Sequence, residues 1–286
     1  KVAFDVSLWA EIADRVDGVG LDYALVKARR GGEGYDAWQD LARSVLRFQR
    51  VCASAGPESV SLVSARRGAE ELRWLCLDPS VWLGPWLAGF GGFVGVSATV
   101  RPERFYRDLL GLPADRLSVV DVPPEFPAEN RAVFVAPRVS TAWRDRAAHA
   151  GRTAALVEEI IEATPGNVAV FFSSFEMLDD IAARWRLPGR ELLRQGPGVD
   201  EDTRLAWVRR LGEGGAPVVL CAVLGGVFAE GVDPPPGGLS TVVVVGPALP
   251  PVGLERDLLR AHYEERYGAG DVYASWIPGL TKVIQA

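Results

Sequence analysis

A glycine-edged acidic turn is the segment whose residue types point most strongly to chemistry. It follows the apolar run 218–223 and begins at Gly225, and its chemistry-bearing residues are Gly226, Glu230, Gly231 and Asp233. Glycine at the end of a strand lets the backbone approach a ligand closely. A carboxylate binds phosphate poorly, but it can accept a hydrogen bond from a ribose hydroxyl or act through Mg²⁺ and water. The turn is therefore a candidate ligand site, and a purely structural acidic turn is the alternative.

Short hydroxyl-rich segments form a second group of candidates. They are Ser97-Ala98-Thr99, Ser140-Thr141 with Arg146 close by, and Ser173-Ser174. Hydroxyl groups, arginine side chains and free backbone N–H groups are the groups that contact nucleic-acid phosphates. Small hydroxylated residues also cap helices, so a structural role is the alternative for the serines.

Alternating strands and helices are predicted to position these segments. Apolar runs predict strands over 93–96, 132–136, 168–172, 218–223 and 241–245. Helical spacing of apolar residues predicts helices over 144–163, 175–185, 202–211 and 257–267. The alternation indicates a parallel sheet covered on both faces. Because such sheets bind ligands at the carboxyl ends of their strands, the loops after 96, 172 and 223 are the ones to inspect.

The first part of the chain has a different, mainly helical character. Apolar residues recur at helical spacing over 36–52. The runs 60–63 and 71–77 are typical of short strands joined by a turn. A short helix opening at Arg101-Pro102 is predicted to stop at Gly111, and a second unit starts near Ala114. We therefore expect two domains, 1–113 and 114–286.

Several segments, taken in order, resemble the motifs of XPD/DinG-type helicases. They are Ser97-Ala98-Thr99, Phe126-Pro127-Ala128-Glu129-Asn130-Arg131, Val139-Ser140-Thr141, and the segments 166–175, 225–233, 243–251 and 285–286. The departures are Val100 for the family's Leu, Ser173 for Pro, Phe175 for Tyr and Pro234 for Phe. The resemblance extends from about Ser61 to Ala286. The segment before it fits only loosely, as the end of a helical arch.

The resemblance implies the C-terminal portion of an ATP-dependent DNA helicase. Such a protein couples ATP hydrolysis to translocation on single-stranded DNA, in DNA repair or replication. The fold it implies is α/β, with a RecA-like parallel sheet and helices on both faces. This second motor domain would follow a mainly helical segment and the last strands of the first motor domain.

The resemblance also assigns roles to the candidate residues. ATP and Mg²⁺ would lie beside the acidic turn, held by Gly226, Glu230, Gly231 and Asp233. Catalytic roles would fall to Glu230, Asp233 and Gln285. The coupling segment would be Ser97, Ala98 and Thr99. Single-stranded DNA would contact Ser140, Thr141, Arg146, Ser173 and Ser174.

Motifs that the complete reaction needs are missing from this sequence. It has no GxxxxGK[ST] phosphate loop, no DEAH-type pair for Mg²⁺ and no glycine-arginine motif after Ala286. The four cysteines that bind an iron–sulfur cluster in many relatives are also lacking, so this chain does not support such a cluster. We therefore expect a fragment that shares its ATP site with an N-terminal motor half. Alone, it is expected neither to hydrolyse ATP nor to unwind DNA.

Composition narrows the protein class. The net charge is −6, which argues against coating nucleic acid by bulk charge. Three scattered cysteines suit a reducing cytoplasm, and two histidines leave little for a metal site, so none is expected. No apolar run reaches the ~20 residues of a membrane span. Lys1 begins the sequence without Met, which is typical of a trimmed piece.

Two other function classes compete with the helicase. One is a non-catalytic RecA-like scaffold that kept the fold and binds a protein partner, since fold alone does not fix function. The other is a Rossmann-type enzyme acting on a small molecule. No GxGxxG follows a strand in this sequence, which disfavours that third interpretation.

Overall fold

The chain forms two compact units. The computed structural model describes residues 6–30, 36–66, 69–123, 127–229 and 233–286. One unit comprises Lys1–Phe93 with Tyr106–Leu117, and the other comprises Val94–Phe105 with Ser118–Ala286. The Ser97–Thr99 segment therefore lies in the second unit, with the parallel sheet.

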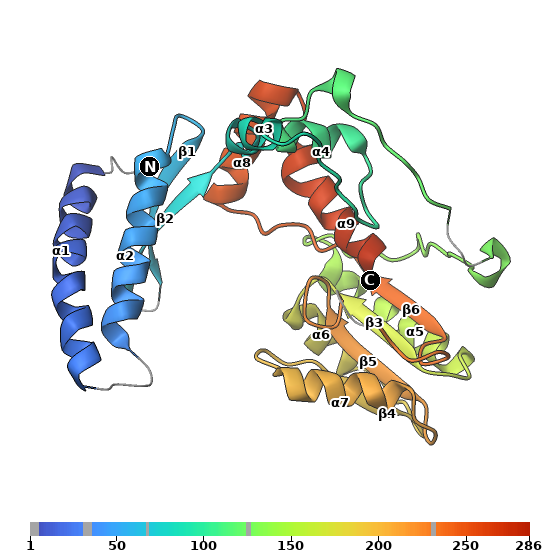
Figure 1. The fold of residues 1–286 in the computed structure, drawn as a ribbon. Helices are drawn as coiled ribbons and strands as arrows, with labels where there is room; N and C mark the ends of the chain where they lie inside the picture. Colours follow the sequence, from blue (N-terminus) through green and yellow to red (C-terminus); the bar gives the residue numbers. More distant parts are fainter. Residues whose placement is uncertain (1–5, 31–35, 67–68, 124–126, 230–232) are drawn as a thin grey trace. The chain divides into compact units, whose positions relative to one another are not determined.

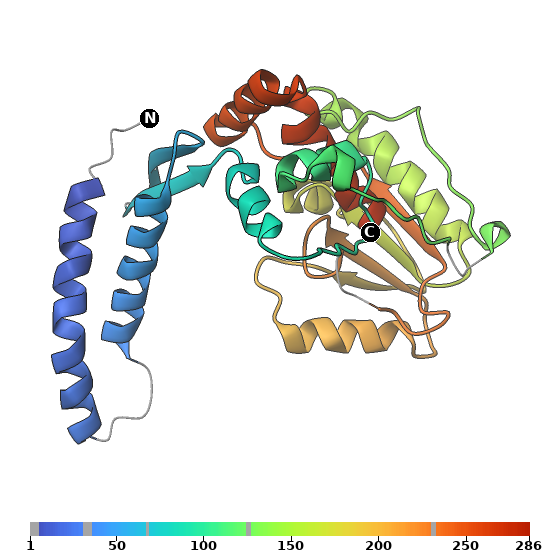
Figure 2. The same ribbon diagram turned by 45° about the horizontal axis from the view of Figure 1, so that its top comes forward.

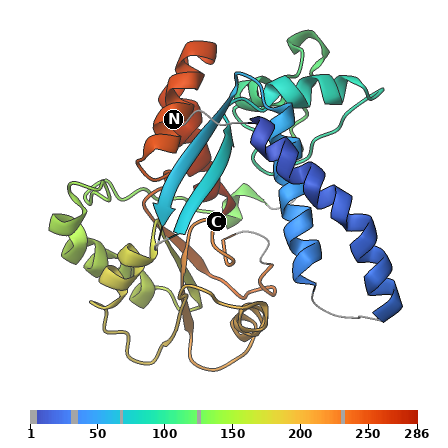
Figure 3. The same ribbon diagram turned by 90° about the vertical axis from the view of Figure 1, so that its left-hand side faces the viewer.

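The first unit begins with two helices that lie side by side (Figure 3). They are α1 (Val6–Arg30) and α2 (Ala37–Ser54). Trp9 packs edge-on against Phe48, with ring centroids 4.8 Å apart. Asp36 caps α2 by accepting a hydrogen bond from the Gln39 backbone N–H. The predicted helix over 36–52 is confirmed.

An antiparallel hairpin, one short helix and most of another also belong to this unit. Strands β1 (Ser59–Arg66) and β2 (Ala69–Cys76) pair along their whole length (Figure 3), which confirms the predicted strand pair. Helix α3 (Ser80–Ala88) was not predicted; it starts where Asp78, fully buried, accepts hydrogen bonds from Ser80. Helix α4 (Glu103–Leu110) ends at Gly111, as predicted. Gly111 has a φ of +66° and lies against Gly84, so neither position has room for a side chain.

The second unit is built on a four-stranded parallel sheet (Figure 1). Its strand order is β4-β5-β3-β6, and the strands are β4 (Glu191–Arg194), β5 (Val218–Val223), β3 (Val168–Phe172) and β6 (Thr241–Val245). The predicted bounds of β3, β5 and β6 are confirmed, and so is the parallel α/β architecture. Strand β4 was not predicted.

Helices cover both faces of this sheet, as Figure 2 shows for α5 and α7. Alternate strand residues point to opposite faces. On one face Val168, Val170 and Phe172 pack against α5 (Arg146–Ala163) and α6 (Phe175–Ala182). On the other face Ala169 and Phe171 pack in a cluster that includes residues of α7 (Glu201–Leu211) and α9 (Ile277–Gln285). The sheet is thus the centre of a three-layer unit.

Further helical segments complete the unit. They are the 3₁₀ turn Ala128–Asn130, helix α8 (Leu254–Tyr267) and the π-helical turn Val272–Trp276, which leads into α9. Another 3₁₀ turn, Ala114–Arg116, belongs to the first unit. Phe105 packs edge-on against Tyr273, with centroids 5.0 Å apart, and Tyr273 also contacts Tyr263 and Tyr267. This aromatic contact ties the segment around Ser97–Thr99 to the helices that end the chain.

Two predicted strands are wrong. Residues 93–96 and 132–136 belong to no helix or strand and pair with no described strand. Val96 is 92% exposed and Phe134 is 90% exposed, so these apolar runs are not buried as expected. An apolar run becomes a strand only where a neighbouring strand can satisfy its backbone groups. The described residues offer no such neighbour to either run.

Candidate functional site

The carboxyl ends of three strands are level with one another. Phe172 at the end of β3 is paired with Val223 of β5 and with Val245 of β6. Ser173, Leu224 and Gly246, the next residues, therefore begin the loops at one edge of the sheet. Because parallel sheets bind ligands at this edge, these loops are the candidate ligand site.

The glycine turn after β5 is closely fitted by two polar side chains. Gly225 has a φ of +70°, and the Gly226 N–H donates to the Val223 carbonyl at 3.0 Å. A Cβ atom on Gly225 would lie 3.0 Å from Lys282 Nζ, and one on Gly226 would lie 3.0 Å from Gln195 Nε2. The turn therefore needs glycine at both positions. Gly225 has a positive φ, and a Cβ on Gly226 would also lie only 2.9 Å from Val223 Cγ2.

The acidic part of the turn is only partly described. Glu230 and Gly231, predicted to bind ATP, lie outside the described residues. Asp233 is exposed, which leaves its carboxylate open to a ligand. Phe228 and Ala229 are buried in the core on the α7 side of the sheet and anchor the turn.

The Ser97–Thr99 segment is bonded to the last helix. Gln285 Nε2 donates to Thr99 Oγ1 at 3.2 Å. Thr99 is buried, and its backbone N–H donates to Ser97 Oγ at 3.2 Å. Ser97 and Ala98 are exposed. The structure thus brings together two predicted site residues, Thr99 and Gln285, from distant parts of the sequence.

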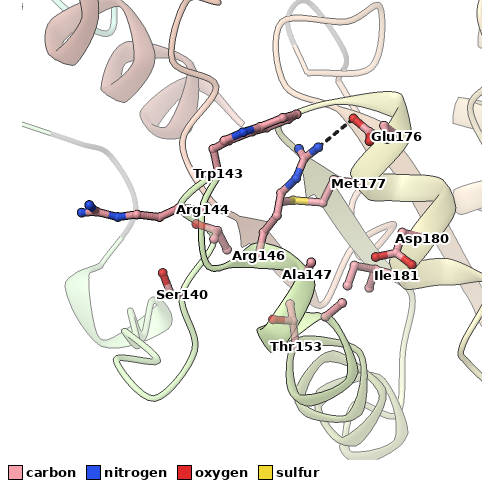
Figure 4. Close-up of a pocket in the computed structure, with 12 residues that line it drawn as sticks. Ser140, Trp143, Arg144, Arg146, Ala147, Thr153, Glu176, Met177, Asp180 and Ile181 are labelled. Carbon is pink, nitrogen blue, oxygen red and sulfur yellow. Dashed lines mark hydrogen bonds and ion pairs between the residues drawn. The ribbon is translucent and has the colours of Figure 1, made fainter.

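A cavity of about 470 Å³ gathers another group of predicted residues (Figure 4). Ser140, Thr141 and Arg146 line it, together with Glu176 and Met177 from the first turn of α6. Ser140 Oγ donates to Asp145 Oδ2 at 3.0 Å. The segment that precedes α5 and the start of α6 therefore form one recess.

Arginine and tryptophan dominate this recess. Arg146 Nη2 lies 2.8 Å from Glu176 Oε2, and its guanidinium lies 3.9 Å from the centroid of the Trp143 ring. Figure 4 shows Arg146 reaching toward Glu176, whereas Arg144 extends away from this pair. Trp143 is 76% exposed, so one aromatic residue stands open to solvent beside a cation.

The two serines after β3 have local partners. Ser174 Oγ accepts a hydrogen bond from the Met177 N–H at 3.2 Å and caps α6. Ser173 Oγ lies 3.5 Å from Met177 Sδ. The helix-capping alternative describes Ser174 correctly, although its hydroxyl hydrogen still leaves it able to donate. Both serines lie beside Glu176 and Met177 in the chain, hence next to the recess.

Three further residues were not singled out from the sequence. They are Lys282, Gln195 and Trp143. Trp143 lies between Thr141 and Arg146, and Lys282 lies one helical turn before Gln285, so proximity to a motif was the available signal. No signal marked Gln195, because its position depends on the pairing of β4 with β5.

The described residues offer neither a metal cluster nor a membrane-spanning helix. Among the described residues, no group of three or more His, Cys, Asp or Glu side chains could hold a metal ion. No described helix has both the length and the apolar character needed to cross a membrane.

Comparison with known proteins connects this unit with helicases. Residues 157–286 match the family model of the helicase C-terminal domain. A solved structure titled XPD_Helicase matches with a TM-score of 0.60 at 17% identity, over 95% of this chain and 48% of that one. This likeness supports the fold.

Two other solved structures also match over part of the chain. XPD_APO is 22% identical over 52% of this chain and 30% of that one, with a TM-score of 0.43. The structure of S. tokodaii Xpd4 is 20% identical over 52% of this chain and 28% of that one, with a TM-score of 0.36. The chain thus spans less than half the length of each solved structure. Residues 157–286 thus match a helicase C-terminal domain.

Proposed function

We propose that this chain is the C-terminal motor portion of an enzyme that couples ATP hydrolysis to translocation on single-stranded DNA. The observation that carries the proposal is the glycine turn at the carboxyl edge of β5, within the helicase C-terminal domain. Gly225 and Gly226 place Lys282 and Gln195 against the backbone there, and Asp233, later in the same segment, is exposed. This is the edge at which parallel sheets bind nucleotides.

In the proposed ATP site this chain supplies one wall. Gly226 and Gly231 allow close approach of the nucleotide, and Glu230 and Asp233 accept hydrogen bonds from hydroxyl groups or from water on Mg²⁺. Gln285, at the end of α9, is the third residue proposed to have a catalytic role. The N-terminal motor half supplies the phosphate loop and the principal Mg²⁺ ligands. Catalysis of phosphoryl transfer depends on such positioned charge, so neither half is active alone.

The proposed DNA contacts lie in and beside the recess at the start of α5 and α6. Arg146, Ser140 and Thr141 would hold a backbone phosphate, with Ser173 and Ser174 next to them. A phosphate would compete with Glu176 for Arg146. Because Arg146 is already paired, DNA binding by this chain alone is expected to be weak and strongly dependent on salt.

Coupling between the sites is assigned to Ser97, Ala98 and Thr99. The hydrogen bond from Gln285 to Thr99 supports this role, because it joins the segment to the helix that ends beside the glycine turn. Work on DNA in repair or replication, within the cytoplasm, is part of the proposal. The three free cysteines of the chain support a reducing compartment.

Co-expression of this chain with the N-terminal motor half tests the proposal. ATP hydrolysis is measured for the chain alone, for the complex, and for the complex with oligo(dT). We expect background turnover alone and DNA-stimulated turnover in the complex, reduced at least about tenfold by Asp233→Asn. Turnover by the isolated chain would contradict the shared site. A complex with no turnover under any condition would favour the scaffold instead.

A further inference from the structure

Two hydrogen-bond donors flank the glycine turn, and neither has a hydrogen-bond acceptor among the described residues. Lys282 Nζ reaches the turn from the last turn of α9 and lies beside Gly225. Gln195 Nε2 reaches it from the residue after β4 and lies beside Gly226. The two donors therefore lie beside two adjacent glycines at the carboxyl edge of the sheet.

The orientation of the Gln195 amide is fixed by its other atom. Gln195 Oε1 accepts the Val223 backbone N–H at 3.0 Å, and because that partner is a donor, the remaining atom must be the NH₂ group. Gln195 is only 5% exposed. Within the described chain, its Nε2 has no acceptor at hydrogen-bond distance. The amide donor lies beside Gly226, where an acceptor on a ligand could pair with it.

Lys282 adds a positive charge at the same place. It is half-buried, and no carboxylate of the described residues lies within 4.0 Å of its Nζ. The position of Lys282 in the last turn of α9 suits the helix dipole, but the dipole does not explain why the side chain extends over Gly225. Arg146 in the recess differs, because Glu176 already neutralises it.

We propose that Lys282 Nζ and Gln195 Nε2, with the Gly225–Gly226 turn, form a binding site for a phosphoryl group. Phosphate oxygens accept both kinds of donor, and the glycines let the group approach the backbone. The ligand is a phosphate of the bound nucleotide. That assignment rests on the proposed function, whereas the oxyanion chemistry rests on the two donors alone. A DNA backbone phosphate is the other source of the same chemistry.

Binding of inorganic pyrophosphate to the 286-residue chain tests the site. Calorimetry gives the affinity, and thermal unfolding without ligand shows that each variant is folded. Lys282→Gln and Gln195→Glu are each expected to weaken binding by ~10-fold or more, and Lys282→Arg to restore most of it. Gln195→Glu keeps the acceptor for Val223 and removes the donor. Arg209→Gln is the matched control, because it removes an exposed cation of α7.

Competition separates the two sources of phosphate. Pyrophosphate is titrated against a fluorescent ATP analogue and, separately, against labelled oligo(dT). Displacement of the ATP analogue supports the nucleotide assignment. Displacement of oligo(dT) alone supports the oxyanion site but overturns the nucleotide assignment. Pyrophosphate binding that depends on Lys282 but displaces neither probe leads to the same two conclusions. No measurable binding, or equal loss in Lys282→Gln and Arg209→Gln, overturns the site itself.

Discussion

Gln285 donates a hydrogen bond from Nε2 to the hydroxyl of Thr99 at 3.2 Å, across 186 positions of sequence. Thr99 is buried, whereas Gln285 is exposed in the last turn of α9. Lys282, on the same helix, lies beside Gly225. One short helix thus contacts both the Ser97–Thr99 segment and the glycine turn, and any ligand that moves α9 would act on both.

A double-mutant cycle measures this bond. Thr99→Val and Gln285→Leu are combined, and the free energy of unfolding is measured for each single variant and for the double variant. A neutral hydrogen bond contributes ~0.5–1.5 kcal/mol, so the coupling energy between the two sites should fall in this range. The cycle with Ser97→Ala in place of Thr99→Val serves as the comparison, and a coupling energy near zero for the Thr99 pair would contradict the bond.

Trp143 is expected to stack on a DNA base. The ring is 76% exposed and lies 3.9 Å from the Arg146 guanidinium, at the recess proposed to hold DNA phosphate. Stacking on an aromatic residue contributes ~1–3 kcal/mol per base, so Trp143→Ala should weaken oligo(dT) binding at least about fivefold. Trp143→Phe should retain most of the affinity. Fluorescence anisotropy checks this, with Trp86→Ala, an exposed tryptophan of the first unit, as the control.

An equal effect of Trp143→Ala and Trp86→Ala would remove the DNA site from this recess. Salt provides an independent check. Arg146→Gln should reduce the slope of log affinity against log salt concentration, because one phosphate contact is lost.

Asp36 is expected to titrate at unusually low pH. Hydrogen bonds from Lys27 Nζ at 2.5 Å and from Tyr23 Oη at 2.7 Å lower the pKa of its carboxyl to about 2, from an ordinary value of 3.8. Because the folded pKa is depressed, the ionised carboxylate stabilises the α1–α2 pair above pH 3.8. That stabilisation is lost as the pH falls toward about 2.

Carbon NMR of the Asp36 carboxyl measures this pKa directly. Lys27→Met should raise it toward 3.8, because the first and largest cause is removed. A midpoint that does not move in Lys27→Met would show that the ion pair does not form in solution. Asp36→Asn keeps a capping side chain for α2 and should remove this part of the pH dependence.

Asn167 holds three loops at the amino edge of the sheet. Its Nδ2 donates to the Leu211 and Gly238 carbonyls at 2.8 and 2.9 Å, and its Oδ1 accepts the Val218 N–H at 2.7 Å. Asn167→Ala removes all three bonds and should lower the free energy of unfolding by ~2–3 kcal/mol. Denaturant titration checks this, and the exposed Asn130→Ala should change it by less than ~0.5 kcal/mol. Equal losses would contradict the role of Asn167.

The strands of the parallel sheet that were predicted correctly are nearly continuous apolar runs in the sequence. Strands β3 and β5 are buried at every position, and such continuous apolar runs are distinctive in sequence. Strand β4 is short, and its residues alternate between partly buried and exposed, so the sequence offered no such run. Helix α9 contains Gly279, which has a low helix propensity, although Pro278 is in the first turn, where proline is favoured.

The site was predictable only where it coincides with a local motif. Ser140, Thr141 and Arg146 lie close together in sequence and line one recess. Ser174 has the capping role that its position before a helix also predicted. Lys282 and Gln195 reach the glycine turn through the pairing of β4 with β5 and the packing of α9, and both depend on contacts that spacing does not encode.

Translocation is the property that distinguishes a motor from a scaffold. The most direct measurement is ATP-driven displacement of streptavidin from end-biotinylated oligo(dT) by this chain combined with its N-terminal motor half. We predict displacement that requires ATP and both halves, and that Asp233→Asn abolishes without unfolding the complex. Displacement that proceeds equally well with Asp233→Asn would contradict the proposed ATP site, and a folded, DNA-bound complex that displaces no streptavidin would contradict the motor itself.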